Sequence, residues 1–188
     1  LEQPDGLQEL SQRSREQVWS LIGRALARCG READTLREIT LVGNTVMQHL
    51  FAGYSVRGIA AAPFRPETLF DAPETAPLHG VPVRAAPCVA GYVGGDITAG
   101  LLAAGLADMP GTNLFLDIGT NGEMALGSSG GILCCAVASG PAFEGAGISC
   151  GMPGITGAVS HAVYDRGFML DVIGGGEAAG LCGSGLVD

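Results

Sequence analysis

Apolar and polar positions follow a helical period at the start of the chain. Residues 7–29 place apolar side chains near helical spacing, with arginines and glutamates on the other side, which predicts an amphipathic helix covering a core. An apolar run at residues 39–42 then predicts a short strand. The turn Gly43-Asn44-Thr45 leads from it into a second helix at residues 46–52, with Asn44 or Thr45 as N-cap. His49 in this helix is expected to be packed or exposed rather than a ligand.

The middle of the chain is rich in proline. Prolines between residues 54 and 86 exclude long helices and predict an extended connection draped over a surface, or equally a linker between two lobes. Residues 81–89 are expected to form an edge strand, because their two prolines would spoil a central one. Asp96 is interpreted as the N-cap of a helix that runs through Leu106, and the alternative is a carboxylate at a hinge.

Strands and tight turns are predicted for most of the second half. In chain order they are a strand, turn and return strand at residues 114–126, a turn at 128–131, a third strand at 132–138, a loop of small residues at 139–147, and a hairpin formed by 157–163 and 167–173. The first three strands are consecutive and antiparallel, with a small-residue loop after the first and another after the third. We expect these two loops to lie side by side.

The turn that follows Asp117 has the composition of a phosphate site. The carboxylate of Asp117 stands near a strand end, where it can hold a cation or the water shell of one. Gly119 and Gly122 allow main-chain N–H groups to approach an anion closely. The pattern therefore predicts a place for a metal-bound phosphate.

Composition describes a globular chain with few charges. Of its 188 residues, 47% are hydrophobic and 15% charged, which favours extensive burial over disorder. The net charge of −9 disfavours nucleic acid or an anionic membrane as partner. The sequence has no lysine, which excludes a Walker phosphate loop and a Schiff-base mechanism. No apolar segment has the length of a membrane span and no signal-peptide pattern opens the chain, so a soluble, cytoplasmic protein is expected.

The six cysteines do not have the spacing of a metal site. They form no C-x-x-C pair and do not cluster with histidines, so iron–sulfur and zinc patterns are missing, although ligands distant in sequence stay open. We expect reduced, buried thiols, with Cys134-Cys135 on a buried strand.

Several motifs together resemble one protein family. They are Gly43-Asn44-Thr45 with Met47 and His49-Leu50, Gly91-Tyr92-Val93-Gly94-Gly95-Asp96, Asp117-Ile118-Gly119-Thr120-Asn121-Gly122-Glu123, Gly140-Pro141-Ala142-Phe143-Glu144-Gly145, and Cys182-Gly183-Ser184-Gly185-Leu186-Val187-Asp188. In this order and at these separations they resemble the C-terminal ATPase region of reductive activators of corrinoid proteins. The resemblance extends from about Ile39 to the end of the chain.

The resemblance implies an α/β fold of the actin and chaperone-ATPase (ribonuclease H-like) type. In that superfamily, which includes acetate and sugar kinases, two lobes with mixed sheets clamp ATP between them. Residues 1–107 would be the end of the first ATPase lobe with its proline-rich connection, and residues 112–188 the start of the second lobe with its phosphate loop. An upstream phosphate loop, the later adenosine segment and the N-terminal [2Fe–2S] domain of the family are absent from the sequence, so the chain is interpreted as a fragment.

The function implied by the resemblance is the ATP-dependent return of a corrinoid cobalt from Co(II) to Co(I). ATP and Mg²⁺ would be the cofactors, and the partner a corrinoid protein or methyltransferase, with a homodimer as a further expectation. The resemblance implies that Asp117 holds the water shell of Mg²⁺ and that the phosphate is bound by Gly119, Thr120, Asn121 and Gly122, with support from Gly140. Glu123 or Glu144 would orient water, and Asp96 would be a hinge carboxylate that faces the nucleotide. The fragment alone is expected to be inactive, because half the clamp is missing.

Two other classes of function stay open. A small-molecule kinase of the same superfamily would need a carboxylate base beside a substrate pocket, and the sequence does not place one. A non-catalytic ATPase-like fragment that binds a partner protein is the third interpretation.

Overall fold

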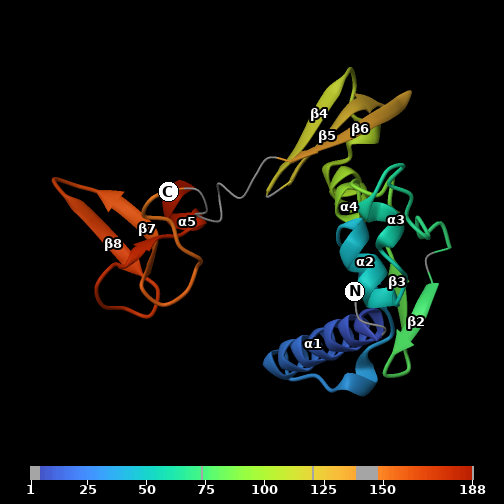
Figure 1. Cartoon of the computed structure of the whole chain (residues 1–188), viewed down its shortest axis with the longest axis horizontal. Coiled ribbons are helices and arrows are strands. Elements are labelled where there is room, and N and C mark those ends of the chain that lie inside the picture. Colours follow the sequence, from blue (N-terminus) through green and yellow to red (C-terminus); the bar gives the residue numbers. More distant parts are fainter. Residues whose placement is uncertain (1–4, 73, 120, 139–147, 188) are drawn as a thin grey trace. The chain divides into compact units, whose positions relative to one another are not determined.

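The computed structural model describes residues 5–72, 74–119, 121–138 and 148–187 (Figure 1). The chain divides into two compact units, one formed by Leu1–Phe115 and Ala125–Cys135, the other by Leu116–Met124 and Ala136–Asp188. The helices are α1 (Gly6–Arg28), α2 (Thr45–Ala52), α3 (Arg57–Ala60), α4 (Gly95–Ala104) and α5 (Gly183–Val187), with 3₁₀ turns at Ala33–Thr35 and Leu106–Asp108. The strands are β1 (Ile39–Leu41), β2 (Glu74–Leu78), β3 (Val81–Ala85), β4 (Asn113–Ile118), β5 (Asn121–Ser128), β6 (Gly131–Ala138), β7 (Ala158–Tyr164), β8 (Phe168–Val172) and β9 (Gly180–Leu181).

Helix α1 covers a small sheet, as its amphipathic pattern predicts. Three of its residues, Val18, Trp19 and Ile22, pack against a core cluster formed by Phe51, Leu78 and Val83. The helix thereby joins α2 to the strands β2 and β3. Its apolar stripe is the reason that it lies against the sheet rather than in solvent.

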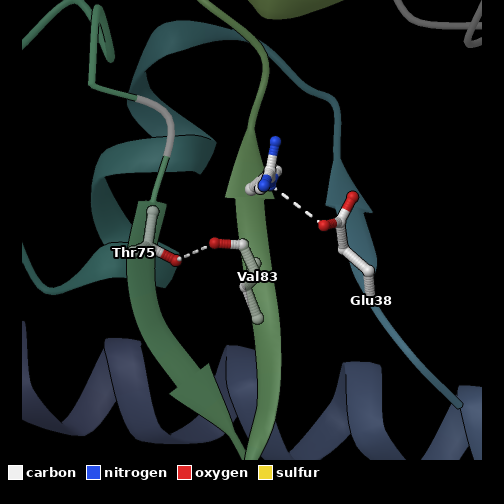
Figure 2. Close-up of polar contacts among 4 residues, drawn as sticks. Glu38, Thr75 and Val83 are labelled. Carbon is white, nitrogen blue, oxygen red and sulfur yellow. Dashed lines mark hydrogen bonds and ion pairs between the residues drawn. The ribbon is translucent and has the colours of Figure 1, made fainter.

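The first sheet has the order β1-β3-β2, with β1 parallel and β2 antiparallel to β3. Figure 2 shows two polar contacts that cross it: the Arg84 Nε lies 2.9 Å from Glu38 Oε2, and the Thr75 hydroxyl donates to the Val83 carbonyl at 3.4 Å. The first contact lies at the start of β1 and the second between β2 and β3. Each strand is therefore tied to β3.

The prediction of an edge strand at residues 81–89 was wrong, because β3 is the central strand. Pro82 is tolerated there since it lies outside both pairings: β1 pairs with β3 only from Val83 onward, and the β2 pairing steps from Val81 to Val83 across an irregularity. Pro87 lies beyond the end of the strand. A two-residue turn at His79 and Gly80, both with positive φ, connects β2 to β3 and was also missed.

The helix starts confirm one prediction and correct another. Asn44 caps α2, and its side-chain oxygen accepts a hydrogen bond from the Met47 N–H at 2.9 Å. Asp96, in contrast, is not an N-cap: Gly94 holds that position, and Asp96 is the second residue of α4. Its carboxylate accepts from the Ile97 N–H at 2.9 Å, within the first turn of the helix, where a negative charge is favourable. Leu106 lies in a 3₁₀ turn after α4 rather than in the helix itself.

Strands β4, β5 and β6 form a second sheet in that order, as predicted. Two-residue connections join them, so neighbouring strands run antiparallel. In β4 the ring of Phe115 lies against Gly100 of α4. Its two neighbours in the strand, Leu114 and Leu116, are exposed. Half-buried and exposed side chains therefore alternate over residues 113–116, whereas the last two residues of the strand are both exposed.

The second unit contains the predicted hairpin of β7 and β8, which turns at residues 165–167. Strand β9 pairs in parallel with the start of β7, and α5 begins two residues after β9 ends. With helices, small mixed sheets and hairpins in one chain, the predicted α/β class is confirmed.

The six cysteines are free, as predicted, but most are not buried. Only Cys88 and Cys182 are buried, while Cys29, Cys135 and Cys150 are exposed. The expectation of buried thiols is therefore wrong for these three and for the half-buried Cys134. Cys134 and Cys135 do lie on a strand, β6, but that strand is not buried as predicted. Among the described helices, α1 included, none combines the length and the apolar character that a membrane crossing requires.

Candidate functional site

The Asp117 turn is a hairpin between β4 and β5. Asp117 is the last residue but one of β4, and its side chain is exposed. The Gly119 N–H donates to the Asn121 carbonyl at 3.0 Å, so in this conformation it is not available to a phosphate. Asn121 is exposed at the first position of β5, and Gly122 is buried beside it.

The structure brings part of the predicted site together. The residues Asp117, Gly119, Asn121, Gly122 and Glu123 share one hairpin, with Glu123 half-buried in β5. The predictions for Thr120, Gly140 and Glu144 fall outside the described residues. Whether any of these residues binds a nucleotide stays a prediction.

The hairpin suits a hydrated cation better than a protein-caged one. Within the described part of the chain, no three His, Cys, Asp or Glu side chains gather into a possible metal site. Mg²⁺ commonly keeps several waters and is held by one or two carboxylates together with substrate phosphates. A single exposed carboxylate such as Asp117 fits that mode, whereas a zinc or iron–sulfur centre would need a closer ligand set.

A second constellation, at the starts of α2 and α4, was not predicted as a unit. The parallel strands β1 and β3 end side by side, and the chain continues from each into a helix. We call residues 43–48 together with 86–96 the α2–α4 junction. Its two turns meet backbone to backbone: the Asp96 N–H donates to the Gly43 carbonyl at 3.2 Å, and a Cβ on Gly94 would lie 2.5 Å from the Asn44 Cα. Gly94 is therefore required by close approach.

Gln48 is the side chain that ties this junction together. It is 1% exposed, and its Oε1 accepts from the Gly43 N–H at 3.2 Å while its Nε2 donates to the Ala86 carbonyl at 2.8 Å. The same Nε2 lies 3.4 Å from the Cys88 sulfur, whose thiol pKa is raised mainly by burial. One amide thus joins the turn after β1 to the chain after β3.

The spacing of polar residues in α2 is a sequence signal for the buried amide of Gln48. Thr45, Gln48 and His49 lie at i, i+3 and i+4, so they share one face of α2, and the structure buries all three. Met47, which sequence patterns would favour for a core, is 55% exposed. A polar stripe in an otherwise apolar helix indicates a buried hydrogen-bond network when the helix follows a strand.

Replacing Gln48 tests the network. Gln48→Met keeps the length of the side chain but leaves the Gly43 N–H and the Ala86 carbonyl without a partner, so we expect a loss of about 2 kcal/mol in unfolding free energy. Gln48→Glu keeps an acceptor for Gly43 but can donate to Ala86 only when protonated. Its deficit relative to wild type should therefore shrink as the pH falls from about 8 to about 5, measured by urea unfolding. An equal deficit of Gln48→Glu at both pH values would contradict this network.

Comparisons with known proteins cover the whole chain. A family model described as the RACo middle region matches residues 1–109, and one described as the C-terminal domain of RACo, the ASKHA domain, matches residues 111–188. A corrinoid activation enzyme, RamQ, of Eubacterium limosum is 32% identical over 100% of this chain and 32% of its own length. A protein of Methanosarcina barkeri described as [Co(II) methylated amine-specific corrinoid protein] reductase is 32% identical over 54% of this chain and 23% of its own length.

A solved structure is similar over the same extent. It is described as a reductive activator for corrinoid, iron–sulfur protein, and it matches 100% of this chain and 31% of its own chain with a TM-score of 0.79 and 38% identity. The present chain thus spans about a third of the length of the RamQ relative and of this structure.

Proposed function

Because the chain belongs to the RACo family, we propose that the full-length protein is an ATP-dependent reductive activator that returns a corrinoid cobalt from Co(II) to Co(I). The family resemblance predicted from the sequence motifs is confirmed by both family models. The relatives described as corrinoid activators support the same activity for this protein. The proposed partner is a corrinoid protein or its methyltransferase, and a homodimer is proposed as the assembly.

The single observation that carries the ATP-dependent part is the Asp117 hairpin. It lies within the residues that match the ASKHA domain, and it presents an exposed carboxylate beside a glycine turn. We assign to Asp117 the water shell of Mg²⁺, and to the main chain at Gly119, Thr120, Asn121 and Gly122 the phosphate, with support from Gly140. For Gly119 to donate to a phosphate, its bond to the Asn121 carbonyl must open first.

Other residues of the chain have smaller proposed parts. Glu123 and Glu144 are candidates to orient the water that attacks the γ-phosphate, and Asp96 is a candidate hinge carboxylate. The division into the end of a first lobe at residues 1–107 and the start of a second at residues 112–188 belongs to the same proposal.

The chemistry is a one-electron reduction. Co(II) gains one electron to become Co(I), and a donor loses one; ATP binding and hydrolysis bias the conformation in which the transfer is favourable. The family's [2Fe–2S] cluster is the proposed donor, but no ligand set for it forms among the residues described here, so this chain is assigned no step at that group.

The test is spectroscopic. Full-length protein is mixed with a Co(II) corrinoid protein and a chemical reductant, and the absorption spectrum is followed before and after addition of MgATP. The proposal expects the Co(II) bands to give way to Co(I) only when ATP is present. Phosphorylation of a small molecule without any change at cobalt would indicate a kinase, and tight partner binding without ATP turnover would indicate a binding module.

A further inference from the structure

A buried histidine fastens the middle segment of the chain to α2. His49 is 0% exposed; its Nδ1 lies 2.7 Å from the Thr45 carbonyl oxygen and its Nε2 lies 3.3 Å from the Thr68 backbone nitrogen. A carbonyl oxygen only accepts, so Nδ1 carries the proton and donates to it. Nε2 is then left as the acceptor for the Thr68 N–H. Both ring nitrogens of neutral His49 are therefore used.

Two aromatic rings and one carboxylate also face the His49 ring. Phe70 and Tyr54 meet the imidazole edge-on, with ring centroids at 5.2 Å and 6.0 Å. The Glu67 carboxylate acts on the ring electrostatically, and α2 contributes the Thr45 carbonyl. Tyr54, two residues after the end of α2, contributes its aromatic ring. Glu67 also accepts a hydrogen bond from the Ser55 N–H at 2.6 Å.

The segment that contains Thr68, residues 55–70, is also held by the Leu69 carbonyl, which accepts from the Cys88 N–H at 2.8 Å, and it supports the turn that leads into α4. The Tyr92 hydroxyl donates to the Ile59 carbonyl at 3.1 Å, and the rings of Phe64 and Tyr92 meet edge-on at 5.5 Å. A Cβ on Gly91 would lie 2.8 Å from the Phe64 carbonyl oxygen, so the two stretches of backbone are in close contact. Loosening residues 55–70 would remove that support from the α2–α4 junction.

We propose that His49 is a pH-sensitive latch, which holds residues 55–70 against α2 while it is neutral and releases them when it is protonated. A proton on Nε2 would point an N–H at the Thr68 N–H, so that two donors face each other and the bond is lost. The new charge would also be buried against the rings of Phe70 and Tyr54, with only the Thr45 carbonyl and the Glu67 carboxylate to offset it. Release lets water reach the ring.

The direction of the pH dependence follows from the surroundings. Burial lowers the pKa of His49 from its ordinary value of 6.5, while the Thr45 carbonyl and Glu67 oppose this shift. A histidine whose pKa is lower folded than unfolded stabilises the fold fully above pH 6.5. That contribution is lost as the pH falls from there through the lower folded value. The latch is therefore closed at neutral pH and opens on acidification.

Amide hydrogen exchange on the full-length protein tests the latch. Protection factors, corrected for the intrinsic pH dependence of exchange, are compared at about pH 7.5 and pH 5. We expect the protection of Thr68 to fall about tenfold or more at the lower pH, because protonation of His49 removes its hydrogen bond to the Thr68 N–H. Unchanged protection of Thr68 across this range would overturn the proposal.

Three variants separate the latch from other titrating groups. His49→Gln keeps an acceptor oxygen for Thr68 without titrating in this range, so the pH dependence of Thr68 protection should disappear. Glu67→Gln should retain it, as should His79→Gln, whose ring stacks on Trp19 at 4.5 Å. Loss of the pH dependence in either of the last two variants, or its persistence in His49→Gln, would count against His49 as the sensor.

Imidazole NMR on the wild-type protein gives a readout that needs no variant. The proposal expects one neutral histidine with Nδ1 protonated at pH 7.5, assigned to His49 by its burial. A charged ring, or the opposite tautomer, at that pH would refute the latch even if His49→Gln failed to fold.

Discussion

Replacing Asp117 with alanine is expected to abolish MgATP binding by the full-length protein, with a loss of affinity of roughly 100-fold or more. A charged hydrogen-bond partner is worth up to about 3 kcal/mol, and 2.7 kcal/mol corresponds to about a factor of 100 in affinity. Asp117 carries the only charge proposed for the cation at this hairpin, so no other assigned side chain compensates. Isothermal calorimetry with ATP at saturating Mg²⁺ measures the change directly.

Two companion variants make that result specific. Asp117→Asn keeps the size of the side chain and removes its charge, so it should lose nearly as much affinity as Asp117→Ala. Asp165, an exposed carboxylate in the β7–β8 turn, provides the control, and Asp165→Ala should bind like wild type. If Asp117→Ala bound MgATP with wild-type affinity, the assignment of the phosphate site to this hairpin would be wrong.

Replacing Gly94 with alanine is expected to cost about 3 kcal/mol or more of unfolding free energy. The added Cβ would lie 2.5 Å from the Asn44 Cα and 2.6 Å from the Thr45 backbone nitrogen. Both obstructing atoms are backbone, so no rotamer change relieves the contact, and the two helix starts must move apart. Urea unfolding followed by the fluorescence of the single tryptophan, Trp19, measures the loss.

A glycine-to-alanine substitution inside α1 should instead raise the unfolding free energy. Gly23 lies inside α1, and a Cβ built there meets nothing within 4 Å. Gly23→Ala should therefore stabilise the protein by about 0.5–1 kcal/mol, because alanine is the better helix former. Similar effects of the two substitutions would show that close approach at Gly94 is not what stabilises the α2–α4 junction.

Sequence patterns predicted those features that depend on near neighbours. The length of α1 follows from its apolar period, the Asn44 cap from a polar residue after a strand, and the β7–β8 turn from Asp165-Arg166-Gly167. In each case the interacting groups lie within a few residues of one another. The hairpin around Asp117 belongs to the same class, which is why it could be placed from the sequence.

The features that were missed depend on residues far apart in the chain. Gln48 meets Ala86, 38 positions away, and Gly94 meets Asn44, so neither contact leaves a local periodic signal. The central position of β3 was mistaken for the same reason. Proline is disfavoured only in the part of a strand that pairs with its neighbours, and whether Pro82 pairs depends on where β1 and β2 lie. Asp96 was misassigned by only two positions, because Gly94 could cap α4 without any side chain.

Two exposed thiols, one in each compact unit, are suitable sites for measuring a distance between the units with spin labels. Cys29 belongs to one compact unit and Cys150 to the other, and both are exposed, whereas Cys88 and Cys182 are shielded from reagents. After Cys134 and Cys135 are changed to serine, nitroxide spin labels can be directed to the two remaining accessible sites. Electron–electron resonance between the labels would then measure whether the proposed binding of MgATP changes the distance between Cys29 and Cys150.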